Sequence, residues 1–260
     1  MSDFFNRKAE LIIGNSKWTY PELEIGYDIS FDADPEIDIS TISISNLSAS
    51  SMASISRGQP IILNAGYGND LGSIMSGVIS SVASEKSRTT KKLNIKCINV
   101  NNQYLNSSVY KSYKSNVKAS FILSDMSNLT GVKLNKVELA QDTIYKRGFV
   151  AKGKVSDIYK RIASDCKSQL LIKNTIIEII KPSHGYETGY KLTSDTGLIG
   201  VEKIDNSENQ ANYKVTMFLN HDISTKSLLQ IDSNLFKGIA MVVKGSHNDW
   251  RTVVEVVAVG

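Results

Sequence analysis

Histidines and carboxylates are the residues of this sequence whose types could carry out hydrolysis, and they occur in two short combinations. His184 stands three residues before Glu187, and His247 stands two residues before Asp249. A nearby carboxylate can orient an imidazole for general acid–base catalysis. A zinc site, however, needs three or four ligands, and no Gly-x-Ser-x-Gly nucleophile motif occurs. We therefore predict no catalytic and no metal-binding residues, and interpret these histidines and His221 as surface or turn residues.

A glycine-rich segment, Gly66–Gly72 (GYGNDLG), has the composition of a phosphate-binding loop. Such a loop must open a helix, because the N-terminus of that helix supplies the donors to the phosphate. The residues that follow, 72–84, alternate Ile and Val with Ser, which is typical of a strand. We therefore interpret the segment as the turn of a β-hairpin and expect no cofactor.

The composition predicts a folded chain of one large or two small domains. The 260 residues carry a net charge of +4 and are 41% hydrophobic, which suffices for a core. No run approaches the roughly 18 apolar residues of a membrane span, and the first residues do not resemble a signal peptide, so we expect no membrane insertion. Two cysteines cannot staple a chain of this size, and we expect Cys97 and Cys166 to be buried thiols in a reducing compartment.

Charge is unevenly distributed along the first half of the chain. Residues 18–56 contain no Lys or Arg but many acids, which are Glu22, Glu24, Asp28, Asp32, Asp34, Glu36 and Asp38. Residues 86–118 contain no acid but many bases, which are Lys86, Arg88, Lys91, Lys92, Lys96, Lys111, Lys114 and Lys118. Two interpretations stay open: two solvated faces of different charge, or complementary surfaces through which neighbouring copies form a ring.

Aromatic residues allow two further interpretations. Tyr104, Tyr110 and Tyr113 interleave with the lysines and could stack on bases, but the acidic segment nearby argues against a continuous nucleic-acid track. Three aromatic residues near turns could be interface anchors or core residues at the end of a sheet, and both interpretations stay open; they are Trp18, Tyr20 and Trp250.

The hydrophobic periodicity predicts an α+β, mainly β chain: a β block, an α/β centre and a second β block. Period-2 alternation or β-rich runs predict strands over 22–31, 61–67, 72–84, 91–100, 214–219, 227–232, 239–246 and 251–259. Period-3.6 patterns predict helices over 119–130, ended by Gly131, and over 155–166. A hairpin of 169–172 with 175–180 follows the second helix.

Several segments resemble phage tail hub proteins. The strand pair Arg57–Tyr67 (RGQPIILNAGY) and Ile74–Ile79 (IMSGVI) is similar to the pair "G-x-x-V-x-x-x-A-G-Y … I-F-x-G-x-I" of that family. Three further matches follow in the family's order, namely Thr196–Gly200, Met217–Ile223 and His247–Thr252. The matches span most of the chain. They differ from the family at Met75, where Phe is common, and the chain is shorter than many members, so the added domains of larger hubs are expected to be absent.

The resemblance implies a late-control D-like hub of a contractile tail or phage-like bacteriocin. It implies two small tube-like β-barrel domains, 1–107 and 196–260, with an α/β middle domain, 108–195. Three chains would present a pseudo-sixfold ring to the hexameric tail tube and hold the central spike on the other face. The implied partners are two further copies, the tail tube protein, the spike and baseplate wedge proteins. DNA would only pass through the lumen, which polar side chains should line.

The implied location is the virion baseplate, assembled in the bacterial host cytoplasm, and no site residues are carried over from the family. An isolated monomer would expose apolar patches and strand edges, so we expect it to self-associate or to be poorly soluble. Two alternatives belong to other classes. A small cell-wall-degrading hydrolase of a tail tip would use Glu187 or Asp249 with His184 or His247, and a carbohydrate- or protein-binding β-module would be stabilised by its ligand.

Overall fold

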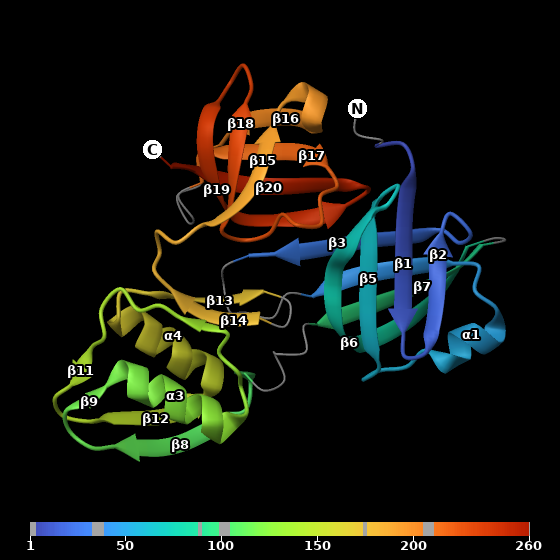
Figure 1. Cartoon of the computed structure of the whole chain (residues 1–260). Coiled ribbons are helices and arrows are strands. Elements are labelled where there is room, and N and C mark those ends of the chain that lie inside the picture. The colour runs from blue at the N-terminus through green and yellow to red at the C-terminus, as the bar shows by residue number, and fades with distance from the viewer. Residues whose placement is uncertain are drawn as a thin grey trace. The chain divides into compact units, whose positions relative to one another are not determined.

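The computed structural model describes residues 4–32, 39–87, 90–98, 105–173, 176–204 and 211–259, and strands predominate in them. The chain forms two compact units (Figure 1). The first contains Met1–Asp32, Asp38–Asn99 and Gly185–Gly260, and the second contains Ala33–Ile37 and Val100–His184. The first unit has two hydrophobic cores and the second has one. The expected α+β, mainly β class is confirmed.

The first part of the first unit, here called the N lobe, is an antiparallel sheet with the strand order β3-β4-β7-β6-β5-β1-β2. Its elements are β1 (Arg7–Ile13), β2 (Ser16–Tyr20), β3 (Ile25–Phe31), β4 (Ser40–Ser45), α1 (Ala49–Ser54), β5 (Pro60–Tyr67), β6 (Asp70–Ser87) and β7 (Thr90–Ile98). Alternate residues point into the core, where Ile42, Ile44 and Ile95 are completely buried. The predicted strands of this region are confirmed.

The second part of the first unit, here called the C lobe, has the strand order β16-β17-β20-β19-β18-β15. Its elements are β15 (Tyr186–Leu192), the 3₁₀ helix η1 (Ser194–Thr196), β16 (Leu198–Lys203), β17 (Tyr213–Phe218), β18 (Ser227–Asp232), β19 (Lys237–Asn248) and β20 (Arg251–Val259). Its core is formed mainly by small and β-branched residues, among them Val215, Val242 and Val254. The strand β15 falls within residues 108–195, which the sequence assigned to a middle domain, and it pairs with β18; the three-domain division itself stays a prediction.

The two lobes have the same strand order, although the sequence has no exact repeat. If each N-lobe strand is matched to the C-lobe strand at the same sheet position, the order β3-β4-β7-β6-β5-β1 becomes β16-β17-β20-β19-β18-β15, and the order along the chain is also the same. The irregularities match as well. The β6–β7 register shift after Ile79 corresponds to the β19–β20 shift after Val242. One difference is that β1 is antiparallel to β5, whereas β15 is parallel to β18.

A direct strand pairing joins the two lobes into one sheet. The end of β3 pairs antiparallel with the end of β19, and Asp28 lies opposite Asn248 and Ser30 opposite Ser246. The sheet therefore runs without interruption from β16 through β19 and β3 to β2. Figure 1 shows β3 reaching from the N lobe to the C lobe.

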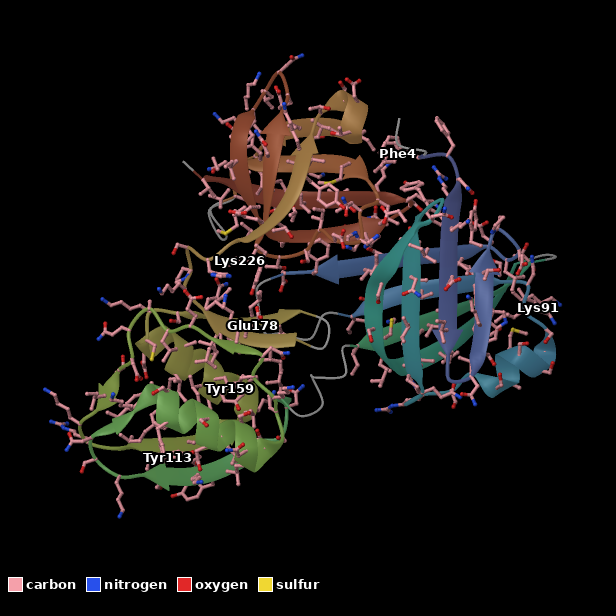
Figure 2. The ribbon with its side chains drawn as sticks, in the orientation of Figure 1. Phe4, Lys91, Tyr113, Tyr159, Glu178 and Lys226 are labelled. Carbon is pink, nitrogen blue, oxygen red and sulfur yellow. The ribbon has the colours of Figure 1, made fainter. Side chains whose placement is uncertain are left out.

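The second unit packs two helices with short strands around its own core. Its elements are β8 (Ser108–Tyr113), β9 (Val117–Lys118), α3 (Ala119–Thr130), β10 (Lys136–Val137), β11 (Ile144–Tyr145), β12 (Phe149–Lys154), α4 (Val155–Asp165), β13 (Gln169–Lys173) and β14 (Ile176–Ile180). Gly131 ends α3 in the left-handed conformation with φ 71°, as expected of a C-terminal glycine. The predicted hairpin of β13 and β14 is confirmed, and its turn residue Asn174 lies outside the described residues. Figure 2 shows Tyr159 of α4 pointing into this unit, where its side chain is completely buried.

Among the described residues, no helix combines the length and the apolar character that crossing a membrane requires. Both cysteines are free and buried, as predicted.

We expect both cysteines to resist alkylation in the folded protein. Burial raises the pKa of the Cys97 thiol to about 12, so the reactive thiolate is scarce even at pH 9. Maleimide labelling followed by mass spectrometry should therefore detect almost no adduct in buffer and two adducts in denaturant. Rapid modification of either thiol in the folded chain would contradict the burial described above.

Candidate functional site

The glycine-rich segment forms the tip of the β5–β6 hairpin, as predicted. Tyr67 lies opposite Asp70, and Gly68 and Asn69 form the turn. A Cβ atom on Gly66 would collide with the backbone oxygen of Asp70, and one on Gly72 would collide with the imidazole ring of His221. The glycines therefore permit close packing of this hairpin rather than phosphate binding.

His221 connects this N-lobe hairpin to the loop that follows β17 in the C lobe. Its Nε2 lies 2.9 Å from Asp70 Oδ1, and its Nδ1 lies 3.1 Å from Asp222 Oδ1. Tyr190 donates a hydrogen bond of 3.0 Å to Asp222. The prediction placed His221 in a turn or at the surface; the residue does lie in a turn, but only 16% of its side chain is exposed because it packs over Gly72.

His247 and Asp249 lie at the turn end of the β19–β20 hairpin. His247 is 3% exposed, and its Nδ1 lies 3.0 Å from Thr252 Oγ1. Its ring packs on Phe31 with the centroids 4.9 Å apart, which places it at the junction of β3 with β19. Asp249 and the next residue, Trp250, both have positive φ, 42° and 62°, as a tight two-residue hairpin turn requires. The prediction that His247 is a surface or turn residue is wrong, because its ring fills the lobe junction.

His184 and Glu187 belong to different units. The ring of His184 lies in the second unit, 3.2 Å from Lys136 Nζ and 3.4 Å from Glu138. Lys136 and Lys181 lower the pKa of Glu138, so this carboxylate is ionised at neutral pH. Glu187 is an exposed residue of β15. Among the residues with described positions, no group of three or more His, Cys, Asp or Glu is placed to hold a metal ion.

An aromatic cluster occupies the end of the N-lobe core where the C lobe begins. Trp250 is 8% exposed and packs on Tyr20 with the ring centroids 4.9 Å apart. Tyr67 donates a hydrogen bond of 2.6 Å to the backbone oxygen of Trp250, and burial raises the pKa of this tyrosine. Phe4, which Figure 2 shows beside the junction of the lobes, stacks on Phe218 at 4.5 Å. Of the two interpretations of Trp250, the core residue at a sheet end is correct.

The acidic and basic runs meet on one sheet of one chain. Asp28 on β3 lies opposite Thr41 on β4, which in turn lies opposite Lys96 on β7. The basic run also extends into the second unit, where Lys111 binds Asp125 at 2.6 Å. The residues of each charged run therefore lie on several different strands and loops and do not form one continuous surface segment. The predicted members Asp34, Glu36, Asp38, Arg88 and Tyr104 lie outside the described residues.

Polar residues form rows on the face of the sheet that points away from the cores, and we call these rows the polar face. Apolar pairs, Ile239 with Val259 and Met241 with Val257, lie on the same face of the C lobe. Directly opposite residues project from the same face of a sheet. One row of opposite residues crosses the lobe junction and consists of Arg251, Asn248, Asp28, Thr41, Lys96 and Ser81. The matching row of the C lobe alternates in charge and consists of Glu202, Lys214, Glu255 and Lys244. These rows suit contact with water or a polar partner.

No protein-family model matches the sequence, and no curated protein matches it significantly. Solved structures with 9–10% identity have the same fold. A tail protein from Neisseria meningitidis MC58 aligns over 97% of this chain and 96% of its own with a TM-score of 0.68. The 43 kDa tail protein of prophage MuSo2 from Shewanella oneidensis aligns over 97% of both chains at 0.71. An E. coli type VI secretion component, described as similar to the bacteriophage T4 tail proteins gp27 and gp5, aligns over 96% of this chain and 77% of its own at 0.62.

Proposed function

We propose that this chain is a structural hub of a phage or phage-like tail baseplate, a trimeric adaptor that joins the hexameric tail tube to the central spike. The observation that carries the proposal is the presence of two lobes with the same strand order in one chain, joined edge to edge by β3 and β19. Three such chains present six similar lobes. A threefold assembly can then match a sixfold partner without a change in the number of contacts.

Two further observations support this function. The rows of the polar face present hydrophilic side chains, as the wall of an open lumen requires, and Thr41 and Ser43 on the same face of β4 have short side chains. The shared fold with phage and prophage tail proteins supports a structural rather than an enzymatic role. The partners would be two further copies, the tube protein, the spike and wedge proteins of the virion baseplate, and DNA would only pass through.

The oligomeric state tests the proposal. At micromolar concentration, native mass spectrometry should detect an assembly of three times the 28.6 kDa chain mass. Images of assembled particles should locate three copies between tube and spike. A chain that stays monomeric at micromolar concentration and is absent from tail particles would refute the hub function.

A further inference from the structure

The two-stranded sheet of β8 and β12 has an exposed face to which the hub function assigns no role. Figure 1 shows these strands at the margin of the second unit. Directly opposite residues project from the same face of a sheet. The exposed residues of this face pair across the strands as Ser108 with Lys154, Tyr110 with Lys152, and Ser112 with Val150. The alternate residues point the other way, and Phe149 and Ala151 among them are buried in the core of the unit. We call the exposed side the β8–β12 face.

The second unit is strongly basic, and the strands of this face contain no acid. Residues 100–184 include 14 Lys and Arg against 6 Asp and Glu, a net charge of +8, whereas the whole chain carries +4. Neither β8 (SVYKSY) nor β12 (FVAKGK) contains Asp or Glu. Among the described residues, Lys152 and Lys154 have no ion-pair partner. Both ammonium groups can therefore bind an anion without first breaking a contact within the chain.

The polar side chains of the β8–β12 face are all hydrogen-bond donors. The hydroxyl groups of Ser108, Tyr110 and Ser112 can donate, and the ammonium groups of the two lysines can only donate. Phosphate oxygens are acceptors, and proteins contact the phosphates of nucleic acids with Lys, Ser and Tyr side chains. A polymer of phosphates therefore matches this face in charge and in hydrogen bonding.

Tyr110 adds a feature that contact with phosphates alone does not require. It is 72% exposed and stands in the middle row of the face, directly opposite Lys152. Aromatic rings beside cations bind single-stranded nucleic acids without sequence preference, because each unpaired base can stack on the ring. The bases of a duplex are stacked inside it and would leave the ring of Tyr110 unused.

The structure removes the objection that the sequence raises against a nucleic-acid site. The acidic run of residues 18–56 includes Glu22 and Asp28, which belong to the first unit and therefore do not interrupt the β8–β12 face. Tyr113, which could also stack on bases, packs against the core instead, and its hydroxyl donates a hydrogen bond of 2.7 Å to Asp125. Tyr110 is thus the tyrosine of β8 that is free to stack.

We infer that the β8–β12 face binds single-stranded nucleic acid through its phosphates and one stacked base, without sequence preference. Lys152 and Lys154 stand two residues apart on one strand, about 7 Å along the face, and bind the phosphates. Tyr110 stacks on a base between them and the serines of β8. The inference goes beyond the hub function, and it does not depend on the number of copies because all these residues lie in one chain.

Fluorescence anisotropy with the full-length chain tests the inference. The probes are a labelled oligothymidylate and a labelled duplex of the same length. The single strand should bind with a Kd of about 1–10 μM at about 50 mM salt, more tightly than the duplex, and lose affinity as salt rises. Poly-glutamate serves as a competitor of a different chemical class.

Three variants separate the two kinds of contact. The double substitution Lys152→Ala with Lys154→Ala should weaken binding and lower the slope of log K against log salt by about 1.4, because each lost phosphate contact contributes about 0.7. Tyr110→Ala should weaken binding of the single strand by about tenfold and leave the duplex unchanged, whereas Tyr110→Phe, which keeps the ring, should bind like the original chain. These side chains are exposed, so the fold should persist, and circular dichroism checks it.

The matched control removes the same charge elsewhere in the second unit. Lys133→Ala with Lys160→Ala changes two exposed lysines outside β8 and β12 and should leave the salt slope unchanged. An equal loss in both double variants would indicate a diffuse charge effect and overturn the inference. Equal binding of duplex and single strand, with no effect of Tyr110→Ala, would refute the stacking. Displacement of the probe by poly-glutamate at the same charge concentration would assign the face to an acidic protein segment instead. None of these results would change the trimer test of the hub proposal.

Discussion

Replacement of Trp250 by alanine should lower the free energy of unfolding of the first unit by about 3–5 kcal/mol, the usual cost of deleting a large buried aromatic ring. The ring is buried among Tyr20, Tyr27 and Tyr67 at the end of the N-lobe core, yet it belongs to a C-lobe hairpin. The substitution therefore removes core packing and a contact between the lobes together. Urea denaturation followed by tryptophan fluorescence measures the change.

Tryptophan fluorescence follows the unfolding of the first unit, because both tryptophans, Trp18 and Trp250, belong to that unit. In the Trp250→Ala variant, Trp18 still reports this unfolding. The control is Trp18→Ala, since Trp18 is only partly buried on β2 and its loss should cost clearly less. Equal destabilisation by both substitutions would contradict the special position of Trp250.

Replacement of Gly66 by alanine should destabilise the first unit by about 3 kcal/mol, at the upper end of the cost of overpacking. The new Cβ would overlap the backbone oxygen of Asp70 in the facing strand, and backbone cannot rotate aside as a side chain can. The β5–β6 hairpin must therefore separate locally, which also displaces Asp70 from His221. The same denaturation experiment measures the loss.

The chain provides a matched control in Gly200, another strand glycine. A Cβ atom there meets nothing within 4 Å, and its φ is outside the positive range. Gly200→Ala should change the free energy of unfolding by less than about 1 kcal/mol and in the stabilising direction, since alanine lowers the entropy of the unfolded chain. If Gly66→Ala were as stable as Gly200→Ala, the β5–β6 hairpin would accommodate the added Cβ atom, and the predicted collision with Asp70 would be refuted.

The sequence predicted those elements in which one periodicity dominates. The helix α4 follows Val155, Ile158 and Ile162 at helical spacing, and the same residues are buried in the structure. The predicted strand β6 is confirmed despite Gly77, and its buried residues Met75, Gly77 and Ile79 alternate with the less buried Ser76 and Val78. In both elements one face is buried, and the hydrophobic pattern of the local sequence is therefore sufficient to predict the secondary structure.

Strands with weaker patterns were missed. The sequence analysis predicted no strand at β1 or β15, although Ala9 and Leu11 of β1 are buried. In β15, residues such as Glu187 and Gly189 interrupt the apolar pattern, and its pairing with β18 decides its conformation.

The shared topology of the lobes could not be predicted either, because it depends on strand order rather than on residue identity. Matching positions hold different residues, for example Ile42 in the N lobe and Val215 in the C lobe. The roles of His221 and His247 depend on contacts across the lobe junction, and the nearby sequence contains no signal for these contacts.

The β3–β19 pairing has a consequence for biosynthesis. Residues 28–31 leave the ribosome more than 200 positions before their partners, residues 245–248. Until then the nascent chain carries β3 with one side open, while the N lobe and the second unit have already been made. Loop closure over such a span is slow, so the hydrogen bonds between the lobes form late. The product of a stalled ribosome would expose the very edge that full-length protein conceals, which makes premature termination a route to aggregation.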